Sequence, residues 1–306
     1  MLSSERPVER LTNPRADRVR KVASLAGRSA RQRTGLFLAE GPQSVAEALR
    51  LWLSPDGAAA AAALPMLDAL YYAPELLEEG SELAELISLA LAAQPQAGEA
   101  NQAPSRIFVR EASPEVLGTM GDSVTSQGVL AVCRIPAQFS AESSPDVRGG
   151  ALSLALCRVQ DPGNVGTMVR TADAAGAASV VVTTGTADPF SPKAVRAAAG
   201  SHFHIPVVPL RGAAEAAAAA RAEGMQVLAA DGHADMLLSQ VQTLQEPTLW
   251  LLGNEAQGLD DAERAAADAV VAIPRYGAAE SLNVAVAGAV CLYASAMAAH
   301  SPRSRS

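Results

Sequence analysis

The C-terminal half of the chain alternates short apolar runs with helical stretches, and this alternation is the feature that most limits its fold. The runs are four to six residues long and rich in Val, Leu and Ala, which is typical of strands buried on both faces. Strands that alternate with helices form a mostly parallel sheet with helices on both of its faces. We therefore expect an α/β fold in which ligands bind beyond the carboxyl ends of the strands. The predicted strands are Leu152–Cys157, Ser179–Thr184, Val227–Ala230, Thr248–Leu252 and Val270–Ile273.

A smaller α/β domain is predicted ahead of this sheet. Residues Arg33–Leu49 read as an apolar strand, a Gly-Pro turn and an amphipathic helix. Residues 135–149 combine Pro, Ser and paired Gly with little periodicity, which indicates a linker between domains. The expected organisation is a first domain over 1–134, a linker over 135–149, a second domain over 150–300 and a tail over 301–306. Further strands of the first domain are predicted at Ala69–Tyr72, Arg106–Val109 and Gly128–Cys133.

Charge is distributed unevenly along the chain. The whole chain has 24 basic and 32 acidic residues and a net charge of −8, which argues against a simple polycation. Residues 1–35 nevertheless hold nine basic and three acidic groups, a local balance of +6. Such an arm could attract phosphate, or it could be an amphipathic helix whose charged face is solvated. The candidate phosphate-binding residues of the arm are Arg18, Lys21, Arg31 and Arg33.

Several familiar functional classes are not supported by the sequence. No two glycines are two residues apart and no Gly-Lys pair exists, so neither a dinucleotide fingerprint nor a P-loop is present. The three cysteines form no CxxC motif and the four histidines have no metal-site spacing, so no metal is expected.

The longest apolar stretch, Val284–Ala299, has 16 residues and is too short for a bilayer. Because the N-terminus also lacks an export signal, we expect a reduced, cytoplasmic setting.

Three loops at predicted strand ends carry polar residues that could serve a ligand. The first begins after Cys157, turns at Asp161-Pro162-Gly163 and continues into a helix that Asn164 could cap. On that helix Arg170 lies away from the apolar stripe, where it could serve a ligand or simply pair with Asp173.

The other two loops follow the predicted strands at Thr248–Leu252 and Val270–Ile273. Gly253 and Gly258 bracket an acidic residue, so the backbone there could approach a ligand closely. After Pro274 a loop leads to Ser281, which is predicted to cap the helix of small residues that follows.

These loops together resemble the three ordered motifs of a known enzyme family. The motifs are Asn164-x-Gly166-x-x-x-Arg170-Thr171, then Gly253-x-Glu255-x-x-Gly258-Leu259, then Ile273-Pro274 with Ser281-Leu282-Asn283-Val284. In this order and spacing they closely resemble the SpoU/TrmH branch of the SPOUT RNA methyltransferases, over about residues 151–299. The N-terminal part, notably the segment RTGLFLAEG, is similar to the L30e-like substrate-binding domain that often precedes it.

The resemblance implies a fold, a cofactor and a reaction. It implies a deep trefoil knot in the sheet domain, bound S-adenosyl-L-methionine, a homodimer, and methylation of a ribose 2′-hydroxyl of RNA, with ribosomal RNA favoured. The residues it implies for catalysis are Arg170, Asn164, Glu255, Ser281 and Asn283. Those it implies for the cofactor are Leu252, Gly253, Asn254, Gly258, Ile273, Ser281 and Leu282.

Some features qualify this hypothesis. A guanidinium is a poor base at neutral pH, so Arg170 suits phosphate binding and charge stabilisation better than proton abstraction. Lys193 and Arg196 lie one helical turn apart and could contact RNA or only solvent. Ala285 stands where the family often has Ser, which bears on rate or substrate rather than on class.

Other functions remain open at this point. They are 2′-O-methylation of transfer RNA, methylation of a base, a catalytically silent RNA-binding or ribosome-associated protein, and a nicotinamide oxidoreductase. Retention of Asn164, Arg170, Glu255 and Asn283 together argues against the silent protein. The missing glycine fingerprint argues against the oxidoreductase.

Overall fold

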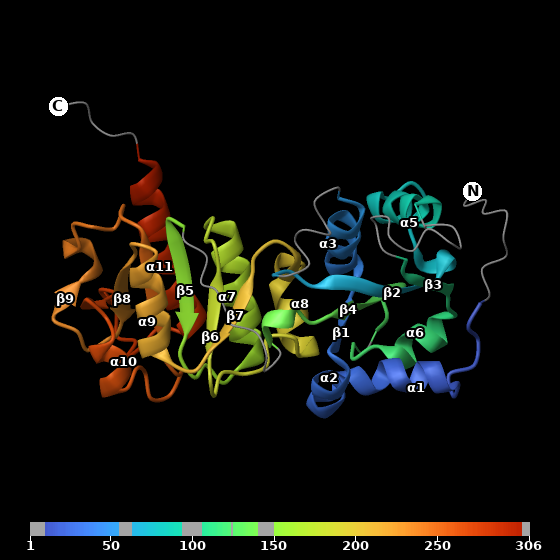
Figure 1. Cartoon of the computed structure of the whole chain (residues 1–306), viewed down its shortest axis with the longest axis horizontal. Coiled ribbons are helices and arrows are strands. Elements are labelled where there is room, and N and C mark those ends of the chain that lie inside the picture. Colours follow the sequence, from blue (N-terminus) through green and yellow to red (C-terminus); the bar gives the residue numbers. More distant parts are fainter. Residues whose placement is uncertain (1–9, 55–62, 94–105, 124, 140–149, 302–306) are drawn as a thin grey trace. The chain divides into compact units, whose positions relative to one another are not determined.

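The computed structural model describes residues 10–54, 63–93, 106–123, 125–139 and 150–301 (Figure 1). By internal contacts the chain forms two compact units. The first, which we call the N-terminal unit, comprises Met1–Ala137 and Phe190–Phe203. The second, the sheet unit, comprises Gln138–Pro189 and His204–Ser306. Each unit has its own β-sheet and core, so each is described by itself.

The N-terminal unit is built on a four-stranded sheet in the order β1-β4-β2-β3. Strand β4 runs antiparallel to both of its neighbours, while β2 and β3 are parallel. Alternate residues of the strands face α1 and α6 on one side, while α3 packs on β2 and β4. The strands are β1 Leu36–Glu40, β2 Met66–Tyr72, β3 Phe108–Glu111 and β4 Val129–Arg134; the helices are α1 Asp17–Ala23, α2 Arg28–Thr34, α3 Pro42–Leu53, α5 Glu82–Ala92, α6 Pro114–Met120 and α8 Pro192–Ala198.

The sheet unit contains a seven-stranded sheet in the order β7-β6-β5-β10-β8-β11-β9, and all of its pairings are parallel. The predicted α/β fold with a parallel sheet is therefore confirmed. The strands are β5 Leu152–Leu156, β6 Val180–Thr183, β7 Val207–Leu210, β8 Gln226–Ala230, β9 Met236–Leu237, β10 Thr248–Leu252 and β11 Ala269–Ala272; the helices are α7 Pro162–Ala174, α9 Ala213–Ala222, α10 Asp261–Ala265 and α11 Val284–His300.

Helices cover both faces of this sheet, as the sequence predicts. The alanine-rich helix α9 packs on one face, where Leu249 and Leu251 of β10 point. On the other face the indole nitrogen of Trp250 donates a hydrogen bond to the Ser295 hydroxyl of α11 at 3.0 Å. A Cβ at Gly288 would lie 2.7 Å from Leu252 Cδ1, so glycine is what lets α11 approach the end of β10 this closely.

Two strands of the sheet unit were missed in the sequence. Strand β7 contains Pro209, and proline within an apolar run weakens a strand prediction, although it is tolerated on an edge strand. Strand β9 has only two residues. Both lie at the edges of the sheet, where pairing is needed on one side only.

The order of the strands bears on the expected knot. Strands β10 and β11 come last in the chain but insert between strands that precede them, since β10 lies between β5 and β8 and β11 lies between β8 and β9. This order reverses direction near β5 and β10, which is where open parallel sheets bind ligands. The knot itself stays a prediction.

The division into units differs in one respect from the expected domains. Residues 190–203, which the sequence assigns to the second domain, group with the N-terminal unit, where α8 contacts β1. Phe190 and Phe203 of this segment pack against Phe37 of β1, with ring centroids 5.0 and 6.5 Å apart. The expected linker over 135–149 lies mostly outside the described residues, and the grouping changes between Ala137 and Gln138.

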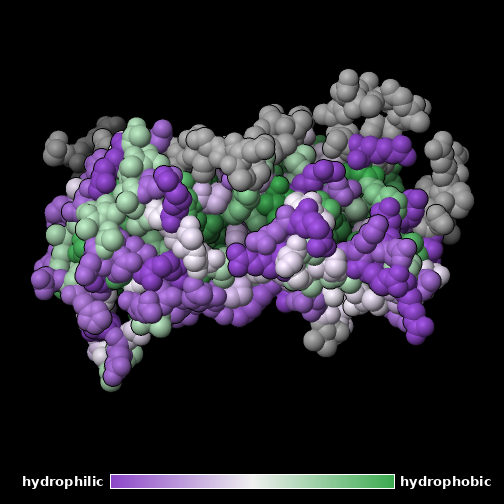
Figure 2. Space-filling model, turned by 60° about the horizontal axis from the view of Figure 1, so that its bottom comes forward, coloured by the Kyte–Doolittle hydropathy of each residue, from purple (hydrophilic) through white to green (hydrophobic). Residues whose placement is uncertain are grey.

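The surface is largely polar, and no described helix is long and apolar enough to cross a bilayer. Figure 2 shows hydrophilic side chains over much of one face of the molecule, with apolar residues exposed in patches between them. Several of the largest side chains are fully buried, among them Trp52, Trp250, Tyr71 and Phe37. Burial of these groups is the main favourable contribution to folding.

Candidate functional site

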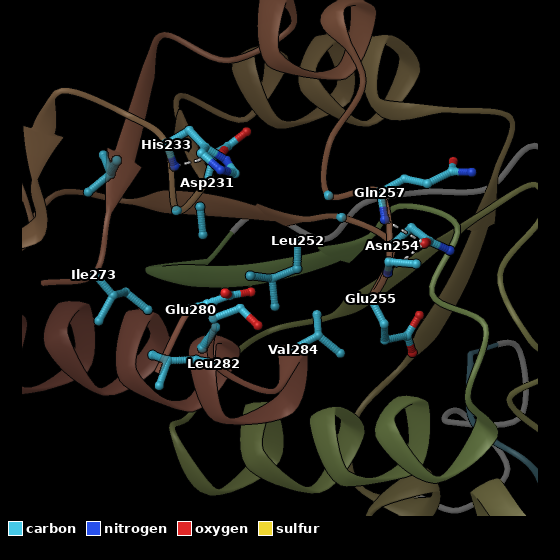
Figure 3. A pocket seen from close by; sticks show the side chains of 18 of the residues that line it. Asp231, His233, Leu252, Asn254, Glu255, Gln257, Ile273, Glu280, Leu282 and Val284 are labelled. Carbon is cyan, nitrogen blue, oxygen red and sulfur yellow. Dashed lines mark hydrogen bonds and ion pairs between the residues drawn. The ribbon is translucent and has the colours of Figure 1, made fainter. Parts of the chain in front are cut away.

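A pocket of about 310 Å³ opens at the carboxyl ends of β8, β10 and β11, inside the sheet unit (Figure 3). In Figure 3 Asp231 and His233 lie on one side of the pocket and Glu255 on the other, with Leu252 and Val284 between them. Its volume lies within the range of small-molecule sites. All seven residues that the sequence proposes for the cofactor line it: Leu252, Gly253, Asn254, Gly258, Ile273, Ser281 and Leu282.

Hydrogen bonds within the loop Gly253–Gly258 fix its conformation. Asn254 and Gly258 exchange backbone N–H···O bonds of 3.0 and 2.8 Å. The Asn254 side-chain oxygen accepts the N–H groups of Ala256 and Gln257 at 2.9 and 3.0 Å. A Cβ at Gly253 would lie 2.3 Å from the Gly258 carbonyl carbon, a distance that no side chain tolerates. The loop can therefore close only around glycine at position 253.

Glu255 ties this loop to the start of α7. Its carboxylate accepts the backbone N–H groups of Gln160 at 2.9 Å and Asp161 at 3.0 Å. It also accepts the amide of Asn164 at 3.1 Å. Partial burial alone would raise the pKa of Glu255, but these three donors outweigh it and hold the pKa below its usual range. Glu255 is therefore an ionised anchor at neutral pH and a weak base.

Asn283 extends the same network to the third loop. Its side-chain NH₂ donates to the Asn164 side-chain oxygen at 3.2 Å, and its own oxygen accepts the N–H of Ala285 at 2.8 Å. One chain of hydrogen bonds, Glu255 to Asn164 to Asn283, thus joins the first loop to two loops that lie 91 and 119 residues further along the chain.

The two predicted helix caps were wrong, and the correction explains this network. Asp161, not Asn164, caps α7, because its carboxylate accepts the Asn164 N–H at 2.9 Å. Asn283, not Ser281, caps α11. The shift leaves the Asn164 side chain for Glu255 and Asn283, and it leaves Ser281 on the pocket wall.

Arg170 is exposed on α7 and is not part of the network. No hydrogen-bond or ion-pair partner for its guanidinium exists among the described residues. Asp173, its simplest partner on the same helix, instead lies 2.9 Å from the Nδ1 atom of His204. The structure therefore leaves the charge of Arg170 available to a ligand or to another molecule.

The basic residues proposed for RNA divide into two groups. Arg31 was a wrong choice for surface binding, because it is only 3% exposed and donates to the carbonyl oxygens of Leu25 and Ala26 at 2.8 and 2.7 Å. Arg196 pairs with Asp122 at 2.9 Å, inside the N-terminal unit. Arg18, Lys21, Arg33 and Lys193 are exposed.

Arg18 is also held in place by neighbours. Its guanidinium lies 3.7 Å from the centroid of the Phe108 ring and donates to the Tyr71 hydroxyl at 3.4 Å. No carboxylate partner for Arg18 is found in the part of the chain that the structure describes. Its charge is therefore ordered and uncompensated there.

The structure adds polar residues that the sequence did not single out. Asp231, at the end of β8, pairs with Arg264 at 2.9 Å and accepts the His233 N–H at 2.9 Å, and all three residues line the pocket. Burial alone would raise the pKa of Asp231, but hydrogen bonds from His233 and Arg264 hold it below its usual value. Arg158 contacts the glycine loop from outside the pocket. No sequence motif marks either position, since Arg264 lies 33 residues from Asp231 and Gln257 lies 99 residues from Arg158.

The described residues contain no group of three or more His, Cys, Asp or Glu side chains that could hold a metal ion. The pocket walls instead offer backbone N–H and C=O groups, apolar side chains and a few charges. This lining suits an organic ligand with both apolar and polar parts.

Comparisons with known proteins agree with the motifs. The SpoU rRNA Methylase family model matches residues 151–293. The 23S rRNA (guanosine(2553)-2′-O)-methyltransferase RlmP of Bacillus subtilis (strain 168) is 39% identical over 181 residues, which cover 59% of this chain and 69% of that protein. The structure of AviRb, a SpoU methyltransferase from Streptomyces viridochromogenes in complex with AdoMet, matches with a TM-score of 0.74 and 30% identity over 94% of this chain and 100% of that one. An AdoMet-bound rRNA methyltransferase from Sinorhizobium meliloti matches with a TM-score of 0.73 and 28% identity, over 94% of this chain and 97% of that one.

Proposed function

The chain belongs to the SpoU rRNA methylase family, and from this premise we propose that it transfers a methyl group from S-adenosylmethionine to a ribose 2′-hydroxyl of ribosomal RNA. The observation that carries the proposal is the pocket at the sheet edge, which the second and third motif loops line. Glu255 on its wall and Asn283 are both hydrogen-bonded to Asn164 of the first loop, so the three loops are joined beside the pocket. Relatives named as 23S rRNA 2′-O-methyltransferases support the class of substrate.

The pocket fits S-adenosylmethionine in its chemistry. Gly253 packs directly against the backbone of Gly258, so glycine at this position lets the loop close beside the pocket. Leu252, Ile273 and Leu282 supply apolar surface, while Ser281 and the loop backbone supply polar groups. When bound, the cofactor supplies an electrophilic methyl group on a sulfonium. We assign its binding to these residues together with Asn254 and Gly258.

The remaining task of the protein is to orient and polarise the ribose hydroxyl. Transfer would break the bond between sulfur and the methyl carbon, form one between the ribose oxygen and that carbon, leave S-adenosylhomocysteine, and pass the hydroxyl proton to solvent water. We assign Asn164 and Asn283 to positioning, since Glu255 holds the first and the start of α11 holds the second. Glu255 itself is too weak a base, at its lowered pKa, to take the proton.

Arg170 is assigned to the RNA rather than to the cofactor. Its permanent charge suits the phosphate next to the reacting ribose, or the negative charge that develops on the oxygen. We propose that it acts at the pocket of a second copy of the chain, because it is exposed and lacks a partner among the described residues.

A homodimer would also cover an apolar stripe on α11. Val286, Val290, Tyr293 and Met297 recur every three or four residues and are 50, 37, 42 and 63% exposed. The helix packs beside α7, which carries Arg170. We propose that a second copy covers the stripe.

Mixing two impaired variants, at a cofactor concentration too low for the second of them to bind it, tests this arrangement. One variant is Arg170→Ala, and the other is Gly253→Ala, which blocks the cofactor loop. If Arg170 acts across the dimer, reassorted mixtures regain about a quarter of the wild-type activity, since half of the dimers are mixed and each of those has one intact site. No recovery after verified subunit exchange argues that Arg170 serves its own pocket.

The N-terminal unit is proposed to bind the RNA substrate. Arg18, Lys21 and Arg33 are exposed, and no described residue compensates their charge. Contacts of this kind bind phosphate without reading sequence.

The deciding experiment incubates the protein with S-adenosylmethionine labelled on the methyl group and with total RNA. Label is expected in ribosomal RNA, at a single ribose that alkaline hydrolysis and primer extension can locate. Label in transfer RNA would redirect the substrate, and label on a base would overturn the ribose assignment. Retention of RNA without any label would identify a silent RNA-binding protein.

A further inference from the structure

Arg158, the second residue after β5, has an unusual backbone conformation. Its φ is 59°, and Ala199 is the only other described non-glycine residue with a positive φ. For a residue with a side chain this conformation is energetically unfavourable. Such strain persists only where surrounding contacts hold it.

The guanidinium of Arg158 binds both the end of the glycine loop and Glu263 of α10, the helix that follows it. Its Nε and Nη2 atoms donate to the two carboxylate oxygens of Glu263 at 2.8 and 2.7 Å, a two-pronged pair. Nη1 also donates to the side-chain oxygen of Gln257 at 3.2 Å, and Nη2 lies 3.4 Å from the Gly258 carbonyl oxygen. The pair is sheltered, since Glu263 is only 8% exposed.

The main chain of Arg158 holds the other end of the same loop. Its carbonyl oxygen accepts the side-chain amide of Asn254 at 2.9 Å. Because Asn254 in turn orders the N–H groups of Ala256 and Gln257, one residue controls both ends of the loop.

Glu263 is itself fixed at the start of α10. Its Oε2 atom accepts the Asp260 N–H at 2.9 Å, and its own N–H donates to the Asp260 carboxylate at 2.8 Å. This reciprocal cap fixes the Glu263 carboxylate to which Arg158 donates its hydrogen bonds. Neither Arg158 nor Glu263 lines the pocket.

We propose that Arg158 is a positioning residue that, with Glu263, holds the loop Gly253–Gly258 in the conformation that binds S-adenosylmethionine. The proposal rests on the function proposed above. Arg158 does not touch the cofactor, so its effect is on how often the loop is in the binding conformation. Loss of the hydrogen bonds between Arg158 and Glu263 therefore lowers the apparent affinity for the cofactor and raises its KM, with little change in kcat at saturation.

Arg158→Gly separates this role from a merely structural one. Glycine accepts the positive φ without cost, so the variant relieves strain while removing the guanidinium. Isothermal titration with S-adenosylmethionine is expected to show affinity lowered about tenfold, which corresponds to losing part of a charged hydrogen-bond pair. The KM rises by a similar factor, and hydrogen exchange at the Ala256 and Gln257 amides accelerates in the protein without cofactor.

Three further variants complete the test. Glu263→Gln keeps an oxygen for the Asp260 N–H but loses the charge, and it is expected to reproduce the loss of affinity even if Arg158→Gly folds poorly. Arg158→Lys keeps the charge with a single contact, and its affinity is expected between those of Gly and wild type. Ala199→Gly relieves the same backbone conformation in the N-terminal unit and should leave affinity unchanged.

The outcomes are distinguishable. Wild-type affinity and exchange rates in both Arg158→Gly and Glu263→Gln would overturn the assignment of Arg158 alone. A fall in kcat at unchanged KM would also overturn it, because it would place Arg158 in the chemical step. Failure of the wild-type protein to bind S-adenosylmethionine would instead overturn the proposed function and this inference with it.

Discussion

The two regions proposed to bind ligands differ in how their polar side chains are partnered. Around the pocket of the sheet unit, Glu255, Asn164, Asn283 and Asn254 are hydrogen-bonded to one another or to nearby backbone. In the N-terminal unit, Arg18, Lys21 and Arg33 are exposed, with no compensating carboxylate among the described residues. The first arrangement favours one rigid shape for a small ligand, whereas the second favours long-range attraction to a polyanion.

Because of this difference, we expect substitutions in the two regions to impair ligand binding in different ways. A substitution that breaks the hydrogen bonds of the loop Gly253–Gly258 changes the shape of the pocket, so it should weaken cofactor binding at any ionic strength. Removal of a surface cation changes only local charge, so its effect should be small and should depend on salt. The predictions below use this contrast.

Arg170→Ala is expected to have the largest effect, and it tests the one exposed charge assigned to the chemistry. Loss of a charge that stabilises the transition state lowers transfer by about a hundredfold or more. Affinity for S-adenosylmethionine should stay within a few-fold, since Arg170 is not part of the pocket wall. Single-turnover transfer and calorimetric titration measure the two quantities. Wild-type transfer in this variant would remove Arg170 from the mechanism.

Gly253→Ala is the sharpest test of the rigid loop. The new Cβ would lie 2.3 Å from the Gly258 carbonyl carbon, so the loop must open, and cofactor affinity is expected to fall about tenfold to a hundredfold. Gly277→Ala is the matched control, because Gly277 lies in the loop that follows β11 and a Cβ there meets nothing within 4 Å. Equal affinities of the two variants, measured by titration, would contradict the assigned role of the loop.

Arg31→Ala and Arg33→Ala separate folding from binding within one helix. Arg31 is buried and satisfies two carbonyl oxygens, so its loss should lower the free energy of unfolding by about 2 kcal/mol. Arg33 is exposed, so its loss should leave stability unchanged and reduce the salt dependence of RNA binding by about one unit of slope. Urea unfolding and RNA titration at several salt concentrations measure both. A weaker salt slope in Arg31→Ala at full stability would reverse the assignment.

Glu255→Gln is expected to have a small effect on stability, with a defined pH dependence. The folded pKa of Glu255 lies below its unfolded value, so its ionised form stabilises the fold above the unfolded pKa of about 4.3, and this contribution is lost as pH falls through the folded pKa. Because the carboxylate is partly exposed, the contribution is about 1 kcal/mol or less.

The measurement for Glu255 compares unfolding free energies of wild type and Glu255→Gln from pH 7 to pH 3. The difference should be constant near neutrality and should shrink below about pH 4. A difference that grows on acidification would mean that the carboxylate is protonated in the folded protein, against its three donors.

Much of the fold could be predicted because its signals are local. Apolar runs of four to six residues that alternate with helical stretches identified five strands of the sheet unit. Strands β7 and β9 escaped, because Pro209 interrupts one and the other is two residues long. The grouping of residues 190–203 with the N-terminal unit also escaped, since it depends on contacts of Phe190 and Phe203 with Phe37, far away in the chain.

The candidate site could be predicted in outline but not in its connections. The resemblance of the loops to a known family marked the cofactor candidates, which lie in or next to the second and third loops and all line one pocket. The caps of α7 and α11 were misplaced by a few residues, because Asn164, Ser281 and their neighbours all have side chains that can cap a helix. Arg31 was mistaken for a surface charge, since composition does not reveal that an arginine turns inward to backbone carbonyls.

By itself the sequence determined the class of fold, the place of the site at the strand ends and the identity of its three loops, because periodicity and turn chemistry act over a few residues. Tertiary structure alone decided which polar groups meet. Arg158 and Glu263 are 105 positions apart, and Asn164 and Asn283 are 119 positions apart. Their hydrogen bonds form only when the sheet brings the ends of its strands together, since such a bond requires its atoms to lie about 3 Å apart.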